Sequence, residues 1–177
     1  MENREVFLNG QIRKAGQANL ALVWGIIREC AEDLSNKGFT HWSKYYRESL
    51  VARMLEKKDV YLWGEVGTMT MGLELPWYYS KEDINCFSEA ERPGICISAL
   101  AVRPDCQNAG IGGKLVDFAI NHAKQRGIEW VRLDCRLIPS LERFYKNMGF
   151  NEVGRMYEGN DDEEVYLLME KRVDAGG

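Results

Sequence analysis

The feature that most constrains this chain is an apolar segment that leads through a glycine-rich turn into an amphipathic helix. Residues 95–102 are almost continuously apolar, which is typical of a strand covered on both faces. Three glycines follow within residues 107–113, and apolar residues then recur from Leu115 to Ala123 at a helical period. Gly127 is the predicted end of this helix. Amide groups at a helix start, approached through small residues, favour an anionic ligand.

Spacing alone leaves several interpretations of this turn. A phosphate-binding P-loop needs glycine at position 108, where this chain has Asn108, and serine or threonine after Lys114, where it has Leu115. A dinucleotide-binding GxGxxG motif needs glycine where Leu115 stands, so it fails too. An anion site of another kind and a plain strand-to-helix connection both remain open on these grounds.

Strand and helix patterns alternate along the rest of the chain. The expected elements are a weak edge strand over 6–12, a helix from Asn19 that ends before Gly38, a helix from Ser43 as N-cap to about Lys57, a hairpin over 60–75 around the two-residue turn Gly64-Glu65, a strand over 130–135, a helix over 140–148, and a closing hairpin over 152–157 and 164–171. Residues 76–93 lack periodicity and predict a long loop with room for one helical turn. Because we find no linker or second core, we expect one domain over 1–177.

Composition narrows the function classes. Lys and Arg number 23 against 27 Asp and Glu, so the net charge of −4 argues against a general nucleic-acid binder. Hydrophobic residues make up 45% of the chain, enough for a real core, yet the longest apolar runs fall far short of the ~20 residues of a membrane span. Five cysteines without a CxxC pair, and two histidines, give no pattern for a metal site. With no signal peptide visible after Met1, we expect a cytoplasmic protein.

Two sequence motifs resemble those of the GNAT acetyltransferase superfamily. Residues 97–113 read ISALAVRPDCQNAGIGG, and Gln107 to Gly112 match the hallmark [Q/R]-x-x-G-x-[G/A] of its motif A. Residues 141–150 read LERFYKNMGF and resemble its motif B, a helix that carries Phe-Tyr and is followed by Gly-Phe. Two linked motifs at this separation are far more specific than either alone. The segments 38–42 and 132–135 further resemble a bacterial small-amine branch of the superfamily.

The resemblance implies an α/β fold with a mixed, mostly antiparallel central sheet flanked by helices. Two neighbouring parallel strands would splay apart and admit acetyl-CoA, the co-substrate, with no metal. Main-chain groups of three residues would hold the pantetheine arm, and amides of the turn would hold the pyrophosphate. The residues implied are Leu100, Ala101, Val102, Gln107, Asn108, Ala109, Gly110, Ile111, Gly112, Gly113 and Lys114. Two alternatives stay open: Gln107 orients the turn instead, and Lys114 is only a solvated residue of the first helical turn.

Tyr145 matches the motif B tyrosine, which in many relatives protonates the departing thiolate of coenzyme A. A phenol has a reference pKa of ~10, so it is protonated at neutral pH and can donate as the sulfur gains charge. The alternative is a core aromatic residue that packs beside Phe144. The chain departs from the family where many relatives carry asparagine before this helix, because Ile138 stands there, next to Pro139. A polar contact to the coenzyme is therefore lost or supplied otherwise.

The attacking amine must lose a proton, which calls for a base. Glu74 is the best candidate, predicted to share the polar face of its strand with Thr68 and Thr70, although a plain surface charge would give the same pattern. Cys96 and Cys135 are interpreted as small buried hydrophobic residues rather than nucleophiles.

Five aromatic residues are candidates for a pocket that binds a small cation through its ring faces, with ordinary packing as the alternative. They are Trp42, Tyr45, Trp77, Tyr78 and Tyr79.

The sequence thus predicts an N-acetyltransferase that moves acetyl from acetyl-CoA to a primary amine of a small molecule, protein or peptide. Direct attack in a ternary complex is expected, with no nucleic-acid or membrane partner. The alternative is a catalytically weak acyl-CoA-binding sensor or interaction module of the same fold, which Ile138 and the lack of an obvious base would favour. A homodimer through the closing strands stays open.

Overall fold

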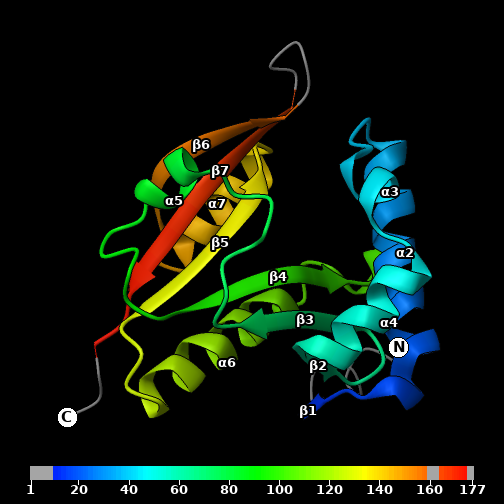
Figure 1. The fold of residues 1–177 in the computed structure, drawn as a ribbon. Coiled ribbons are helices and arrows are strands. Elements are labelled where there is room, and N and C mark those ends of the chain that lie inside the picture. The colour runs from blue at the N-terminus through cyan, green and yellow to red at the C-terminus, as the bar shows by residue number, and fades with distance from the viewer. Residues whose placement is uncertain (1–9, 159–163, 175–177) are drawn as a thin grey trace. The chain divides into compact units, whose positions relative to one another are not determined.

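The computed structural model describes residues 10–158 and 164–174 (Figure 1). In chain order the elements are β1 (Ile12–Lys14), the 3-10 helix η1 (Gln17–Asn19), α2 (Leu20–Asn36), α3 (His41–Tyr45), α4 (Glu48–Lys57), β2 (Asp59–Trp63), β3 (Gly67–Gly72), α5 (Lys81–Asn85), β4 (Gly94–Val102), η2 (Pro104–Cys106), α6 (Ile111–Gln125), β5 (Trp130–Arg136), α7 (Pro139–Asn147), β6 (Asn151–Glu158) and β7 (Glu164–Arg172). No helix in these residues is long and apolar enough to cross a membrane.

The strands form a seven-stranded sheet in the order β1-β2-β3-β4-β5-β7-β6. β4 and β5 run parallel, whereas β1–β2, β2–β3, β5–β7 and β6–β7 are antiparallel. This confirms the predicted α/β class and the mixed, mostly antiparallel sheet.

The described residues divide into two compact units, 10–71 with 99–117 and 72–98 with 118–174, and both β4 and α6 contribute residues to each unit.

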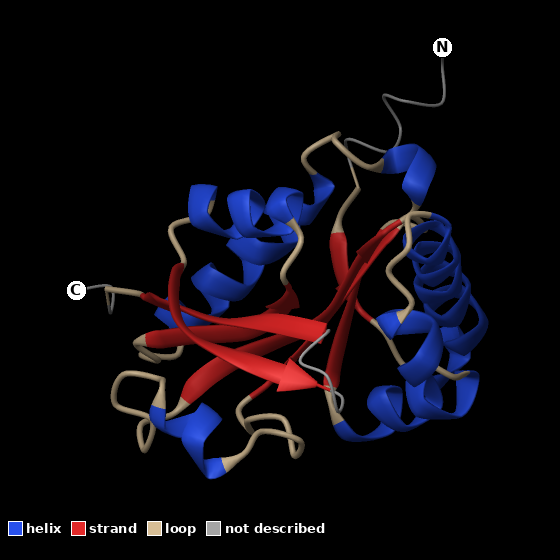
Figure 2. Ribbon diagram, turned by 90° about the horizontal axis from the view of Figure 1, so that it is seen from above, coloured by secondary structure: helices blue, strands red, loops and turns tan. Residues whose placement is uncertain are grey.

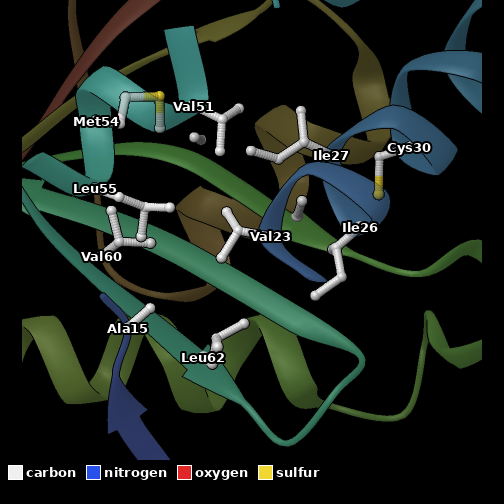
Figure 3. Packing of buried hydrophobic residues seen from close by; sticks show 12 residues of the cluster. Ala15, Val23, Ile26, Ile27, Cys30, Val51, Met54, Leu55, Val60 and Leu62 are labelled. Carbon is white, nitrogen blue, oxygen red and sulfur yellow. The ribbon is translucent and has the colours of Figure 1, made fainter. Parts of the chain in front are cut away.

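The core of the first unit forms where the apolar stripe of α2 meets α4 and the strand β2. Val23, Ile26 and Ile27 of α2 are fully buried, as the helical spacing of the sequence predicts. Their side chains point toward Val51 of α4 and Leu62 of β2 (Figure 3). Full burial of one such side chain stabilises a fold by ~1.5–3 kcal/mol, so this cluster anchors the helices to the sheet.

The predicted helix from Ser43 to Lys57 is in fact two helices. Arg47 is extended, with φ −137° and ψ 154°, and separates α3 from α4. Its guanidinium donates to the carbonyls of Ser43 (2.7 Å) and Tyr46 (2.8 Å) and so satisfies acceptors at the end of α3. Ser43 lies inside α3 rather than at a cap, because its hydroxyl donates to the carbonyl of Ala31 in α2. The edge strand predicted over 6–12 is found as β1 instead, and residues 6–9 lie outside the described part.

The β2–β3 hairpin has a longer turn than its glycine predicted. Gly64 has the expected positive φ of 52°, but Trp63 pairs with Gly67, so Glu65 and Val66 both belong to the turn. Val66 stays in the turn because its carbonyl accepts the main-chain N–H of Arg103 at 2.8 Å. The predicted two-residue loop is therefore wrong by one residue.

The second unit is built on β5, β7 and β6, with helices on both faces. Residues Tyr166 to Glu170 of β7 are buried at successive positions, which requires cover on both sides of the strand. α5 and α7 supply it from opposite faces (Figures 1 and 2). α5 confirms the helical turn expected within 76–93. The hydroxyl of Ser80 caps it by accepting the N–H of Asp83 at 3.1 Å, and the Asp83 carboxylate accepts the N–H of Ser80.

Candidate functional site

The ladder between β4 and β5 is short. Within the described residues it covers three pairs, from Gly94–Trp130 to Cys96–Arg132, although β4 has nine residues and β5 has seven. β5 continues to pair with β7 as far as Arg136. The splay of these two strands that the family resemblance implies stays a prediction.

Ala99, within β4, has a left-handed backbone conformation. It is buried and has φ +49°, a left-handed conformation that costs a non-glycine residue ~1 kcal/mol or more. Such residues are typical of β-bulges, which bend one strand away from its neighbour. Alanine gives no sequence signal for positive φ, so this residue was missed.

The side chain of Gln107 makes a hydrogen bond next to the glycine-rich turn, and its role toward the coenzyme stays a prediction. Its side-chain amide donates to the carbonyl of Val102 at 3.0 Å, and the thiol of Cys30 donates to the same oxygen at 3.1 Å. The main-chain N–H of Arg103 points to Val66. Because main-chain groups alternate along a strand, those of Ala101 face the Val66 side, and those of Leu100 and Val102 face the opposite edge.

The turn itself presents main-chain amides at an exposed helix start. Asn108 and Gly110 adopt positive φ values of 61° and 79°, and residues 107–110 are exposed. The first α6 hydrogen bond within this turn joins the N–H of Lys114 to the carbonyl of Gly110. The N–H groups of residues 111–113 come before this first bond in the chain. They are therefore the N–H groups that a helix start leaves without an acceptor inside the helix, and we call them the amide set. This set and the helix dipole favour an anionic group.

Packing holds this helix start in place. The side chain of Ile111 is buried, and Gly67 of β3 lies so close that a Cβ there would sit 3.0 Å from the Ile111 side chain. The ammonium of Lys114 lies 4.8 Å from the centre of the Trp63 ring. The exposed Lys114 side chain thus contacts a ring, and its role toward the coenzyme stays a prediction.

Tyr145 is a buried residue of α7 with a fixed ring. Its ring makes edge-to-face contacts with Phe144 (4.9 Å between centroids) and Phe150 (5.8 Å). Ile138, at the position where many relatives carry asparagine, is also buried and directly precedes α7. The packing that motif B predicts is confirmed, and the acid role of Tyr145 stays a prediction.

Glu74 does not lie on a strand face. β3 ends at Gly72, and Glu74 follows it as an exposed residue. The face predicted to be polar is buried instead: Thr68 and Thr70 are each 1% exposed, and the Thr68 hydroxyl donates to the carbonyl of Tyr61. The predicted placement of Glu74 is wrong because both strand faces are covered, and its role as base stays a prediction.

A cluster of Tyr78, Tyr79 and Asp134 escaped the sequence analysis as a proton-transfer site. Both tyrosine hydroxyls donate to Oδ1 of Asp134, at 3.0 Å from Tyr78 and 2.7 Å from Tyr79. Desolvation raises the pKa of the Asp134 carboxyl, although the two hydrogen bonds act in the opposite direction. Burial and the neighbouring carboxylate raise the pKa of Tyr79, so it remains a donor. The available signal was an aspartate inside the apolar strand β5.

A second polar cluster anchors the segment 76–93 to the sheet. The guanidinium of Arg132, 2% exposed, donates to the carbonyls of Ser88 (2.9 Å), Glu89 (3.0 Å) and Arg92 (3.0 Å). Ser88 in turn donates its N–H and hydroxyl to the carboxylate of Glu170 on β7. These bonds hold the long connection that carries Tyr78 and Tyr79.

The five aromatic residues predicted to line one pocket fall into different units. Trp42 contacts Tyr46 in a tilted arrangement within the first unit, at 4.9 Å between ring centres. In the second unit Trp77, Tyr78 and Tyr79 form a row of edge-to-face contacts at 5.9 and 5.3 Å.

The cysteines are not poised as nucleophiles. Burial raises the pKa of both Cys30 and Cys135 to about 12, so these thiols stay protonated at neutral pH. Cys96 is buried as well, which confirms the interpretation of Cys96 and Cys135 as small hydrophobic residues.

The mixed sheet and the exposed amides at the start of α6 define an α/β protein with a helix start that suits an anionic ligand. Residues 30–172 match the family described as "Acetyltransferase (GNAT) domain", so the chain belongs to this family and is an acetyl-CoA-dependent acyltransferase.

Solved structures share the fold. The ribosomal-protein-S18-alanine N-acetyltransferase of Escherichia coli is 18% identical with a TM-score of 0.66, over 95% of this chain and 96% of that one. NAA60 of Arabidopsis thaliana, solved with a bisubstrate analogue, is 15% identical with a TM-score of 0.68, over 94% and 99%. A curated relative, the tRNA(Met) cytidine acetyltransferase TmcA of Pyrococcus furiosus, is 27% identical over 84 residues. That match spans 48% of this chain and only 10% of TmcA.

Proposed function

We propose that the chain is an N-acetyltransferase of one domain that transfers the acetyl group of acetyl-CoA to a primary amine by direct attack in a ternary complex. The observation that carries the proposal is the exposed turn at residues 107–110 with the amide set of 111–113. An acyltransferase of this family needs a place for the coenzyme pyrophosphate, and these amides have the right charge and access.

The residues proposed to bind the coenzyme lie in the first unit. Main-chain amides of residues 108–113 hold the pyrophosphate, with the Lys114 ammonium as additional positive charge. The amides of Gln107 and Lys114 already donate to the carbonyls of Pro104 and Gly110. The main-chain groups of Leu100 and the N–H of Val102 bind the pantetheine arm, because strand alternation turns them to the edge away from Val66. The Val102 carbonyl already accepts two hydrogen bonds and serves to orient Gln107.

Proton donation to the leaving group is assigned to Tyr145. As acetyl transfer breaks the bond between carbonyl carbon and sulfur, negative charge develops on the sulfur, and the phenol donates its proton there. The support for this role is the match to motif B and a ring that neighbouring aromatic side chains hold in one orientation.

Two measurements test the proposal. Acetyl-CoA affinity is measured by calorimetry, and thiol release is followed with n-butylamine, spermidine, kanamycin and a short peptide with a free α-amino group. Micromolar binding with amine-dependent thiol release supports an N-acetyltransferase. Binding without release on every probe favours the sensor module, and absence of binding overturns the coenzyme site.

A further inference from the structure

We infer that Asp134, held by Tyr78 and Tyr79, binds the ammonium group of the acceptor and takes its proton. The inference rests on the proposed function and names the group that receives the acceptor amine. It also replaces Glu74, which lies exposed beyond the end of β3.

The two tyrosines engage the same side of the carboxylate. Both hydroxyls donate to Oδ1 of Asp134, at 3.0 Å from Tyr78 and 2.7 Å from Tyr79. The side chain keeps partial exposure, while protein atoms surround most of the carboxylate. A cationic donor at Oδ2 would complete the charge balance of this partly desolvated group.

Its position on β5 agrees with this role. The β4–β5 ladder ends at Cys96–Arg132, two residues before Asp134. Asp134 pairs with Leu168 of β7, so its side chain shares a face with the cluster of Leu168, Tyr79 and Phe87. It therefore lies two residues beyond the last described β4–β5 pair, on the face covered by the segment 76–93.

Neighbouring cations are engaged elsewhere. Arg132, two residues away on the same face, binds three main-chain carbonyls, and Arg136 lies 3.9 Å from the carboxylate of Glu164. Glu158 of β6 adds negative charge that further raises the pKa of Asp134. The charged and titratable groups around Asp134 are Tyr78, Tyr79, Cys96, Arg132, Arg136, Glu158, Glu164 and Glu170. A raised pKa makes the carboxylate a stronger base toward an ammonium group.

The aromatic row suggests which part of the acceptor lies next to the amine. Trp77 is 93% exposed and contacts Tyr78 edge to face. An exposed aromatic ring next to the tyrosine pair suits an alkylammonium chain, through cation–π attraction and apolar cover. The acceptor class is thus an amine on an extended carbon chain.

The proton and electron steps balance. Asp134 takes one proton from the ammonium nitrogen, and the freed lone pair attacks the carbonyl carbon of the thioester. The carbon–sulfur bond breaks with its electron pair on sulfur, which receives the proton of Tyr145. The nitrogen loses its second proton as the amide forms, which restores the Tyr145 hydroxyl. Asp134 releases its proton to water, so one proton leaves per turnover.

The test compares Asp134→Asn with Glu74→Gln and with Asp117→Asn, a matched change at an exposed position of α6. The amide of Asp134→Asn can still accept from both tyrosines. We expect kcat/KM for n-butylamine to fall by ~10²–10⁴-fold at neutral pH in Asp134→Asn alone, with acetyl-CoA affinity unchanged. The loss should shrink at high pH, where the amine is already neutral.

Wild-type turnover by Asp134→Asn, or a comparable loss in Glu74→Gln only, overturns the inference and leaves the proposed function intact. A wild-type protein that acetylates no probe overturns both.

Tyr79→Phe keeps the inference testable if Asp134→Asn fails to fold. It removes a hydrogen bond that lowers the pKa of Asp134, so the acidic limb of the kcat/KM profile should move to higher pH. An unmoved limb in a folded variant contradicts the base role.

Trp77→Ala should raise KM for n-butylamine about two- to five-fold with kcat unchanged. An unchanged KM removes Trp77 from the subsite.

Discussion

At the scale of single residues, function depends on how neighbours adjust ordinary side chains. Burial keeps the thiols of Cys30 and Cys135 protonated, and the same effect makes Asp134 a better base. The Cys30 thiol and the side-chain amide of Gln107 both donate to the carbonyl oxygen of Val102, and so they help to fix the chain that leads into the glycine-rich turn.

Tyr145→Phe tests the acid at this scale. The ring and its contacts with Phe144 and Phe150 remain, and only the proton donor is lost. We expect kcat to fall by ~10²–10⁴-fold, with acetyl-CoA affinity and melting temperature little changed. Phe144→Leu, which alters packing but not proton donation, serves as the control, measured by steady-state thiol release.

Wild-type turnover by Tyr145→Phe across the pH range would leave two explanations. Either Tyr145 is only a core aromatic residue, or slow product release hides the chemical step. A pre-steady-state burst separates them, because only slow release leaves a burst visible.

At the scale of elements, two backbone distortions shape the coenzyme half. Ala99 has a positive φ in the middle of β4, and Asn108 and Gly110 have positive φ in the turn that precedes α6. Both distortions use positive φ, which a regular strand or helix does not contain.

Gly112→Val tests the helix start. A branched side chain in the first turn of α6 should block the approach of a pyrophosphate to the amides. We expect acetyl-CoA affinity to fall more than tenfold, measured by calorimetry, while unfolding stays cooperative. Gly16→Val is the control, since a Cβ there meets no atom within 4 Å. Wild-type affinity in Gly112→Val would remove the coenzyme assignment.

Ala99→Val tests the bulge in β4. A β-branched residue is strained at φ +49°, and the site is buried, so the added methyl groups find little room. We expect a loss of ~2 kcal/mol or more in the free energy of unfolding, measured with urea. Ala101→Val, on the same strand, should cost less, and equal losses would argue against strain at Ala99.

At the scale of the whole molecule, β4 and α6 each supply residues to both compact units. Each unit therefore contains only part of β4 and part of α6. The chain should therefore unfold as one cooperative domain.

A single calorimetric transition, with equal calorimetric and van't Hoff enthalpies, is the expected result. Saturating acetyl-CoA should raise its midpoint, because the ligand binds only the folded state. Two separated transitions, of which acetyl-CoA moves one, would show that the units unfold independently.

Periodicity and motifs in the sequence determined the helices, most strands, the family and the coenzyme turn. These features depend on residues close together in the chain, such as the apolar stripe of α2 and the glycines that precede α6. Other features depend on contacts between distant segments, and only the tertiary structure decided them. Val66 joins a turn because Arg103 binds it, Ser43 lies inside a helix because Ala31 accepts its hydroxyl, and Thr68 is buried because both faces of β3 are covered. The Tyr78–Asp134–Tyr79 cluster joins residues more than fifty positions apart. No local pattern encodes such a pair, because hydrogen bonding and desolvation act through space.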